Sequence, residues 1–493
     1  MAKQLVAANL VGRVLNPRRG RDLPPLRSSL QVVGQPGGIL TGITTECLTE
    51  IFLCARDRSS LGSRSTTVLR LCQVCRTWNN IILDQPALWT VIDMPFPEWI
   101  TNFLARSKEL PLRIYLPEIG LRCLDIVPLL TPHIHRVIML VLQPEFEDKI
   151  LLHLSLWSSA APSLETLSLS HFDLPKEMFK RVKPMQLALD RCRICWSSTI
   201  FSSSLTYLAI WDPHVPISTH RLMSILSTLP ALNWLILVHV VCTSTSQIIA
   251  GQAPILVPRV NLPSLDNIEI IENDSWVLEA ILAGLDLSNV SFIIIETGSA
   301  TDSFSRLLFT VLASADEFCI ESLTIHADPE SSWITLKSKS HPYMGITWDC
   351  RNCHKLVCSM FKVIPLYAIV TLNLDYIFPN STSVWLKWQF ALSGLPFLDT
   401  VVLANGAAID FFSVFPLGHA KLNSVGHWIF RMEPDLFMGN TAPVRSRIKV
   451  AKLAGVPSEK LYRTVEFEGA WWNLEEYEVG TLEHAGWRVI VKP

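Results

Sequence analysis

The chain has 493 residues, of which 49% are hydrophobic and only 17% are charged, and its formal net charge is −2. A mean hydropathy of +0.31 predicts that most residues are buried, which argues against a largely disordered protein. The length suits two or three domains or one long repeat array, and the chain lacks the basic excess typical of nucleic-acid-binding proteins.

The N-terminal segment is basic. Residues 1–27 contain six Lys or Arg residues, and Asp22 is their only acid. They show no continuous apolar stretch before a small-residue cleavage site, so no secretory signal is predicted. We expect residues 1–38 to form a disordered tail, with a mitochondrial presequence as the alternative. A cytoplasmic or nuclear protein would keep its twelve cysteines as thiols.

Two apolar helical stripes follow the tail. Residues 43–55 carry the first, with Thr44 or Thr45 as the predicted N-cap. A second helix is predicted after a polar loop and ends at Asp84-Gln85-Pro86, where Pro86 suits the first position of a third short helix. The stripe of the second helix consists of Val68, Leu71, Cys72, Cys75, Trp78 and Ile82. A unit this small with more than one apolar side is predicted to need a partner.

This segment, residues 39–94, resembles the F-box motif in the variant common in mushroom-type fungi. The matching residues are Glu46, Leu48, Glu50, Ile51, Phe52, Val74, Cys75, Trp78, Ile81, Pro86, Leu88, Trp89 and Ile92. Where that family starts with Leu-Pro, this chain has Ile43-Thr44. The resemblance implies docking on a Skp1-like adaptor, and through it on a cullin. It assigns the docking to Leu48, Ile51, Phe52, Val74, Cys75, Trp78, Ile81, Pro86, Leu88 and Trp89.

Cys72 and Cys75 form a C-x-x-C pair on the second stripe. No other ligand pair lies at zinc-finger spacing, so we predict two core thiols there.

The remaining chain repeats the pattern L-x-x-L-x-L, in which Ile or Val replaces some leucines. Copies start at residues 137, 164, 205, 232, 265, 290, 320, 369 and 398, with weaker copies at Pro184 and Leu422. Most starts lie 20 to 33 residues apart, with one gap of 49. This pattern resembles the degenerate leucine-rich repeats found behind F-boxes, in which strand-helix units stack because none can cover its apolar side alone.

One repeat has the length and apolarity of a membrane span. Residues 222–242 contain no Lys, Arg, Asp or Glu. Pro230 lies in their middle, so we predict a short amphipathic helix, a turn at Pro230 and a buried strand, and no membrane association.

The predicted fold is therefore α/β: a small three-helix F-box followed by an irregular leucine-rich-repeat solenoid with a parallel sheet on its concave face. The predicted domains are a tail (1–38), the F-box (39–94), a connector (95–131), the solenoid (132–460) and a C-terminal cap (461–493). Residues between the leucines are expected to face outward from the strands. They are Tyr207, Trp211, Trp234, Ile236, Glu269, Phe292, Ile294, Glu296, His326, Asn373 and Asp375. The candidates for target binding are Tyr207, Trp211, Trp234, Phe292 and Glu296.

The sequence contains two further C-x-x-C pairs. Cys192 and Cys195 are predicted to be buried thiols. Residues 350–358 read CRNCHKLVC, and Cys350, Cys353, His354 and Cys358 are weak candidates for a zinc site or, as C-x-x-C-H, for haem attachment.

The sequence predicts no catalytic residue and no cofactor, since no nucleotide-binding, metalloprotease or nucleophile-elbow motif occurs. The F-box resemblance implies a substrate adaptor of a Skp1-cullin-F-box (SCF) ubiquitin ligase, which would bind an unknown target protein and perform no chemistry. The alternatives are a metal- or haem-binding redox protein that uses the cysteine pairs, or a repeat scaffold with a decayed F-box.

Overall fold

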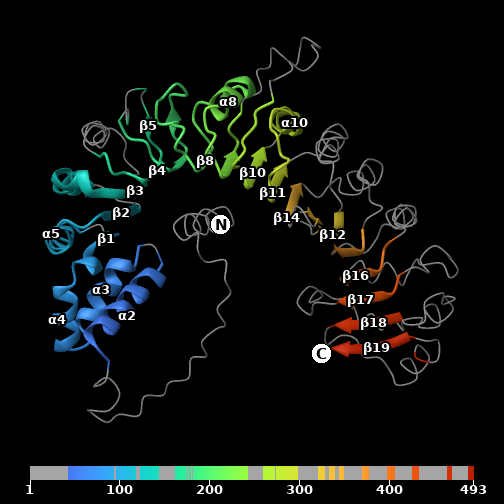
Figure 1. Cartoon of the computed structure of the whole chain (residues 1–493), viewed down its shortest axis with the longest axis horizontal. Coiled ribbons are helices and arrows are strands. Elements are labelled where there is room, and N and C mark those ends of the chain that lie inside the picture. The colour runs from blue at the N-terminus through green and yellow to red at the C-terminus, as the bar shows by residue number, and fades with distance from the viewer. Residues whose placement is uncertain are drawn as a thin grey trace, which may run out of the picture. The chain divides into compact units, whose positions relative to one another are not determined.

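The computed structural model assigns the chain to two compact units, Met1–Leu205 and Thr206–Pro493. Figure 1 shows both units and labels many of their helices and strands. The described residues are 43–60, 62–93, 96–117, 123–143, 161–174, 176, 179, 181–241, 259–272, 274–297, 320–327, 332–338, 343–348, 369–376, 397–405, 425–431, 463–468, 483 and 487–492.

The first described part of the first unit is a helical module. It consists of α2 (Thr45–Arg58), α3 (Arg64–Cys72), α4 (Arg76–Asp84) and the 3-10 helix η1 (Pro86–Trp89). Thr44 caps α2, since its hydroxyl accepts a hydrogen bond from the Cys47 N–H at 3.4 Å. Pro86 occupies the first turn of η1, as predicted.

The single helix expected from Val68 to Ile82 is wrong. The chain breaks between α3 and α4, because Cys75 is extended, with φ −160° and ψ 166°, and serves as the N-cap of α4. Its sulfur accepts a hydrogen bond from the Trp78 N–H at 3.5 Å. The break turns Cys75 out of the stripe that a continuous helix would have formed.

A parallel sheet follows in the same unit. Its strands are β1 (Val91–Ile92), β2 (Leu112–Pro117), β3 (Val137–Gln143), β4 (Thr166–Ser170) and β6 (Gln186–Asp190), paired in that order. The leucines of the repeat are in register across it, as Leu140, Leu167 and Leu187 show. The connecting segments are α5 (Pro97–Arg106), α6 (Cys123–Leu130) and η2 (Thr131–Arg136), and β5 (Asp173–Leu174) pairs with β7 (Arg193–Ile194).

The second unit contains a larger sheet, mostly parallel. It starts with β8 (Tyr207–Trp211), β9 (Trp234–Val238), β10 (Asn267–Glu272) and β11 (Phe292–Thr297). It ends with β15 (Thr371–Tyr376), β16 (Thr400–Asn405), β17 (His427–Arg431), β18 (Arg463–Glu468) and β19 (Trp487–Lys492), also parallel.

Between these two runs lie strands that the repeat pattern did not predict. The 49-residue gap after residue 320 contains β13 (Ser332–Ser338) and β14 (Tyr343–Trp348). They form an antiparallel meander with β12 (Ile320–Ala327), so that β14, and not β12, pairs with β11. β12 in turn pairs with β15 in parallel.

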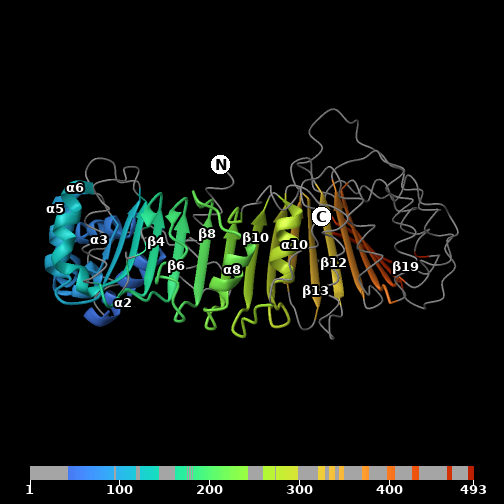
Figure 2. The ribbon, with the colours of Figure 1, turned by 90° about the horizontal axis from the view of Figure 1, so that it is seen from above.

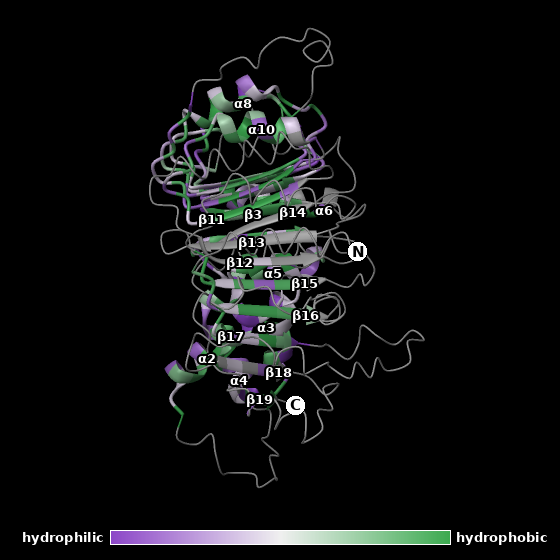
Figure 3. Cartoon of the chain, turned by 90° about the vertical axis from the view of Figure 1, so that its right-hand side faces the viewer, coloured by the Kyte–Doolittle hydropathy of each residue, from purple (hydrophilic) through white to green (hydrophobic). Residues whose placement is uncertain are grey.

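Two helices in the described part of the chain lie on one side of β8 to β11. They are α8 (Thr219–Leu226) and α10 (Ser275–Ala283), which lie on the same side of these strands in Figures 1 and 2. Figure 3 shows both helices with apolar residues in green and polar ones in purple. Residues 222–242 form part of α8, a turn and β9, which confirms the prediction of a helix, a turn and a strand. Among the described residues, no helix has the length and apolarity needed to cross a bilayer.

Candidate docking site on the helical module

The helical module exposes apolar side chains on two neighbouring elements. Ile51 on α2 is 51% exposed, and Val74, between α3 and α4, is 58% exposed. Cys47 and Cys54 lie on the same side of α2 as Ile51, by helical spacing, and Cys75 follows Val74; all three cysteines are exposed. We call Cys47, Ile51, Cys54, Val74 and Cys75 the docking patch.

The two parts of the docking patch are held together by an aromatic contact beneath them. Phe52 on α2 is fully buried, and its ring centroid lies 4.8 Å from that of Trp78 on α4. Because Ile51 precedes Phe52 and Trp78 lies one turn after Cys75, this contact fixes α2 and the start of α4 relative to each other.

Trp89 joins the module to the helix that follows it. The indole is 2% exposed, and its N–H donates to the carbonyl of Ile82 at 2.8 Å. Its ring meets Phe103 of α5 at 4.8 Å between centroids, and the Arg106 guanidinium lies 5.1 Å from the ring centroid. Trp89 is therefore a core residue shared by η1 and α5.

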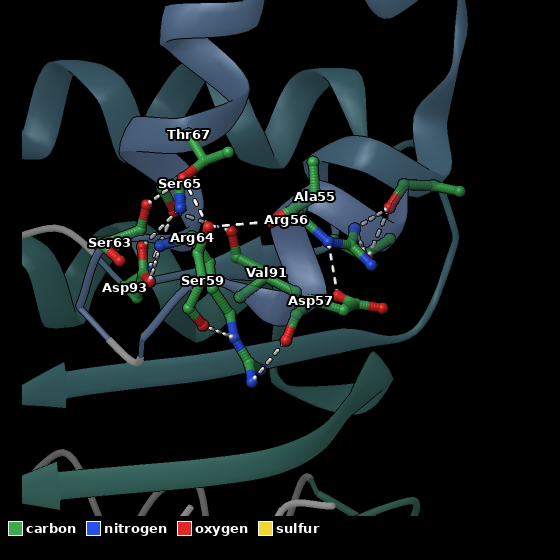
Figure 4. A network of polar contacts seen from close by, with 12 residues as sticks. Ala55, Arg56, Asp57, Ser59, Ser63, Arg64, Ser65, Thr67, Val91 and Asp93 are labelled. Atoms are coloured by element: carbon green, nitrogen blue, oxygen red, sulfur yellow. Dashed lines mark hydrogen bonds and ion pairs between the residues drawn. The ribbon is translucent and has the colours of Figure 1, made fainter. Parts of the chain in front are cut away.

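A buried carboxylate fixes the start of α3. Asp93 is 2% exposed, and it accepts hydrogen bonds from the N–H groups of Gly62 (3.1 Å), Arg64 (2.7 Å) and Ser65 (2.8 Å). Figure 4 shows this network. The Ser65 hydroxyl donates to the Val91 carbonyl at 3.0 Å. These contacts satisfy the free N–H groups at a helix N-terminus and tie it to β1.

Two buried arginines tie the rest of the module together through backbone carbonyls. Arg56 donates to the carbonyl of Ala87 at 2.5 Å, which connects α2 to η1. Arg64 donates to the carbonyls of Ser59 (3.3 Å) and Asp57 (3.4 Å). Burial lowers the pKa of Arg64, while the carboxylates of Asp57 and Asp93 oppose that shift. The module thus exposes apolar groups on its surface, and hydrogen bonds connect the helices in its interior.

Comparison with known proteins agrees with this geometry. Residues 45–95 match the family model described as F-box-like. This segment is an F-box-like domain. The comparison with curated proteins gives no match.

The ten docking residues predicted for the F-box-like domain differ in how far they are buried. Leu48, Phe52, Leu88 and Trp89 are buried, whereas Trp78, Ile81 and Pro86 are half-buried. Ile51, Val74 and Cys75 are exposed. The prediction that Cys72 and Cys75 are core thiols is wrong for Cys75, and Cys72 is half-buried. Cys75 is exposed because the helix break places it at an N-cap.

The polar framework of the F-box-like domain was not predicted. Asp93, Arg56, Arg64 and Ser65 are buried, but a charged residue in an otherwise polar loop gives no periodic signal. The one local hint is Gly62, whose φ of +87° marks the tight turn that brings its N–H to Asp93.

The candidate target-binding residues lie on β8, β9 and β11. Trp211, Trp234 and Phe292 are half-buried and Glu296 is exposed. Tyr207 is only 5% exposed, Ile236 0% and Glu269 7%, so the expected exposure of these three is wrong. Alternation along a strand predicts the face on which a side chain lies but not whether that face is open. The side chains of His326 and Asp375 lie outside the described residues, and Asn373 is half-buried.

Of the other cysteine pairs, only Cys192 and Cys195 are described. Cys192 is buried as predicted, and burial raises the pKa of its thiol to about 12, while Cys195 is half-buried. No group of three His, Cys, Asp or Glu side chains that could hold a metal occurs in the described part of the chain. Cys350, Cys353, His354 and Cys358 lie outside the described residues.

Proposed function

We propose that the chain is the substrate-recognition adaptor of an SCF ubiquitin ligase. The observation that carries this proposal is the F-box-like match at residues 45–95, because F-box domains generally bind Skp1 in such complexes. The docking patch supports it. Ile51 and Val74 each expose more than half of their surface. The other large apolar residues that the structure describes in this domain are buried or half-buried, so these two exposed side chains are typical of a protein-binding surface.

In this proposal the docking patch binds a Skp1-like adaptor, which connects the chain to a cullin. The buried members of the predicted set, such as Phe52 and Trp89, act indirectly by holding α2 and α4 in position. The chain itself performs no chemistry. It raises the effective concentration of a bound target near the ubiquitin-carrying enzyme.

The strands after the F-box-like domain would bind the target protein as an irregular leucine-rich-repeat solenoid. In-register parallel pairing of the repeat leucines supports this interpretation, for example Leu208 with Leu235 and Ile268. The 29-residue spacing and parallel pairing of β15 and β16 fit the same repeat. The antiparallel β13 and β14 would then be an insertion between repeats.

Co-purification with a Skp1-like adaptor tests the proposal. The full chain is expected to bring the adaptor through affinity purification and gel filtration at equal stoichiometry. The double variant Ile51→Asp/Val74→Asp places two charges in the docking patch and should lose the adaptor while remaining folded, because both side chains are exposed.

Met185→Asp is the matched control, since Met185 is also apolar, lies in the same unit and is 47% exposed. It should retain the adaptor. The proposal fails if the unmodified chain does not bind the adaptor, or if the double variant binds as well as the Met185 variant.

A further inference from the structure

The sheet formed by β8 to β11 has one covered side. The side chains of Leu208, Leu235, Ile268 and Ile293 form one row across it and are at most 2% exposed. α8 and α10 supply buried partners on this side, among them Leu226 and Ile281. Parallel sheets normally carry cover on both faces, because each face is apolar.

The other side of these strands is also apolar. Three rows cross it in register, and we call them together the β8–β11 face. The rows are Tyr207, Trp234, Asn267 and Phe292; Ala209, Ile236, Glu269 and Ile294; and Trp211, Val238, Ile271 and Glu296. Nine of these twelve residues are hydrophobic, which is far more than a solvated sheet face requires.

The side chains on this face differ in exposure. Ala209, Ile236 and Glu269 in the middle row are buried, as are Tyr207 and Val238 in the outer rows. Trp211, Trp234, Ile271, Phe292 and Ile294 are half-buried, and Glu296 is exposed. The accessible part of the face therefore consists of large apolar side chains, the half-buried Asn267 and one exposed carboxylate. Such a mixture is typical of the residues that dominate protein-protein binding energy.

The charge of the face has one sign. Its ionisable residues besides Tyr207 are Glu269 and Glu296, and it contains no Lys, Arg or His. Burial raises the pKa of Tyr207 and the Glu269 carboxylate raises it further, so Tyr207 lies within the field of that carboxylate. The Tyr207 hydroxyl is buried without a hydrogen-bond partner among the described residues. A further negative charge would be repelled here, whereas a cation would be attracted.

We propose that the β8–β11 face binds an apolar, positively charged peptide segment of the target protein, with a Lys or Arg side chain paired to Glu296. The aromatic rings of Trp211, Trp234 and Phe292 supply the apolar contacts. This inference rests on the proposed function, because it names the chemistry of the target that the adaptor would hold.

Selection from a random peptide library displayed on phage, with the full chain as bait, tests the inference. The enriched peptides should combine a net positive charge with aromatic or large aliphatic residues. For one enriched synthetic peptide, Glu296→Lys should weaken binding by about two- to fivefold, the effect of one partly exposed ion pair. The Glu296 side chain is exposed, so this variant is expected to fold.

Asp274→Lys makes the same charge change elsewhere in the unit. Asp274 is exposed, precedes α10 and makes no side-chain capping bond, so this variant should bind the peptide as the unmodified chain does. Absence of enrichment, enrichment of neutral or acidic peptides, or equal effects of the two variants would overturn the inference.

Two further measurements distinguish this inference from binding of the chain's own basic segment and from the proposed adaptor function. If peptides bind only after deletion of residues 1–38, the face belongs to the chain's own basic segment and the inference is wrong. Adaptor co-purification is measured on the same samples. If no apolar, positively charged peptide is enriched but the adaptor still binds, only the inference is refuted. If the unmodified chain does not bind the adaptor, the proposed function is refuted.

Discussion

In the F-box-like domain the interior contains charged groups, whereas the covered side of β8 to β11 is aliphatic. Asp93, Arg56 and Arg64 are buried and bonded to backbone groups, while Leu235 and Ile268 are fully buried among other aliphatic side chains. The small domain has little apolar area to bury, so directional bonds position its helices. The sheet repeats one aliphatic row, so its stability is distributed over many similar contacts.

The largest expected effect is in the F-box-like domain. Trp89→Ala removes a buried ring, its bond to Ile82 and its contact with Phe103, and should destabilise the first unit by about 3–5 kcal/mol. Hydrogen exchange measured by mass spectrometry should show faster exchange in α2 to α5. Trp99→Ala, at a site that is 43% exposed, should change little. Equal effects of the two variants would contradict the shared core at Trp89.

A single substitution in the sheet should lower the free energy of unfolding slightly less than Trp89→Ala does. Leu235→Ala opens a cavity in a fully buried row and should destabilise the second unit by about 2–5 kcal/mol. Hydrogen exchange should become faster across β8 to β10. Val370→Ala, at 42% exposure, should cost less than about 0.5 kcal/mol. If Leu235→Ala is equally mild, the stability of the sheet does not depend on this row.

Loss of the buried carboxylate should have a smaller but still measurable effect. Asp93→Ala leaves the N–H groups of Arg64 and Ser65 without their acceptor and should cost about 2–3 kcal/mol. Asp84→Ala, at an exposed helix end, is the control and should be close to neutral. Equivalent exchange rates in α3 for both variants would show that the network does not hold that helix.

The smallest effect concerns a buried carboxyl group at the end of β10. Burial raises the pKa of Glu272 to about 7, although the N–H groups of Val240 and Val241 lower it. Because the folded pKa lies above the unfolded value, the stabilisation is complete below about pH 4.5 and is lost as the pH rises toward 7. The loss should amount to about 1–3 kcal/mol.

Glu272→Gln should remove that pH dependence, since its amide oxygen can still accept the same N–H bonds. Hydrogen exchange of β10 in increasing concentrations of urea, at pH 5 and pH 7.5, measures the difference in its free energy of unfolding between the two pH values. Three other charged or titratable groups act on the Glu272 carboxylate. Asp212 and Asp274 repel it, and the His239 ring lies 3.9 Å from it. His239→Gln is therefore measured as well, because His239 can itself titrate. An unchanged pH dependence in Glu272→Gln would exclude Glu272 as its source.

Sequence reasoning identified different features in the two regions. In the F-box-like domain, the spacing of Val74, Trp78, Pro86 and Trp89 was sufficient to suggest the family. It did not predict the break at Cys75, because a cysteine at that spacing also fits a continuous apolar stripe. The Asp93 network was missed because its bonds join residues about thirty positions apart and follow no periodicity.

In the sheet, the repeat predicted β8 to β12, β15 and β16, and it predicted the register of β8 to β11, as the pairing of Leu208 with Leu235 shows. The antiparallel β13 and β14 were not predicted, since their sequences do not follow the repeat. The burial of Tyr207 was also missed, because alternation assigns a residue to a face and only packing in three dimensions decides its exposure.

The central claim is that the F-box-like domain, through the docking patch, is what binds a Skp1-like adaptor. Hydrogen exchange of the full chain with and without that adaptor tests it most directly. We expect slower exchange in α2 and around Val74 and Cys75, with no change in β9 and β10. Protection confined to the sheet strands, or none anywhere at saturating adaptor, would contradict it.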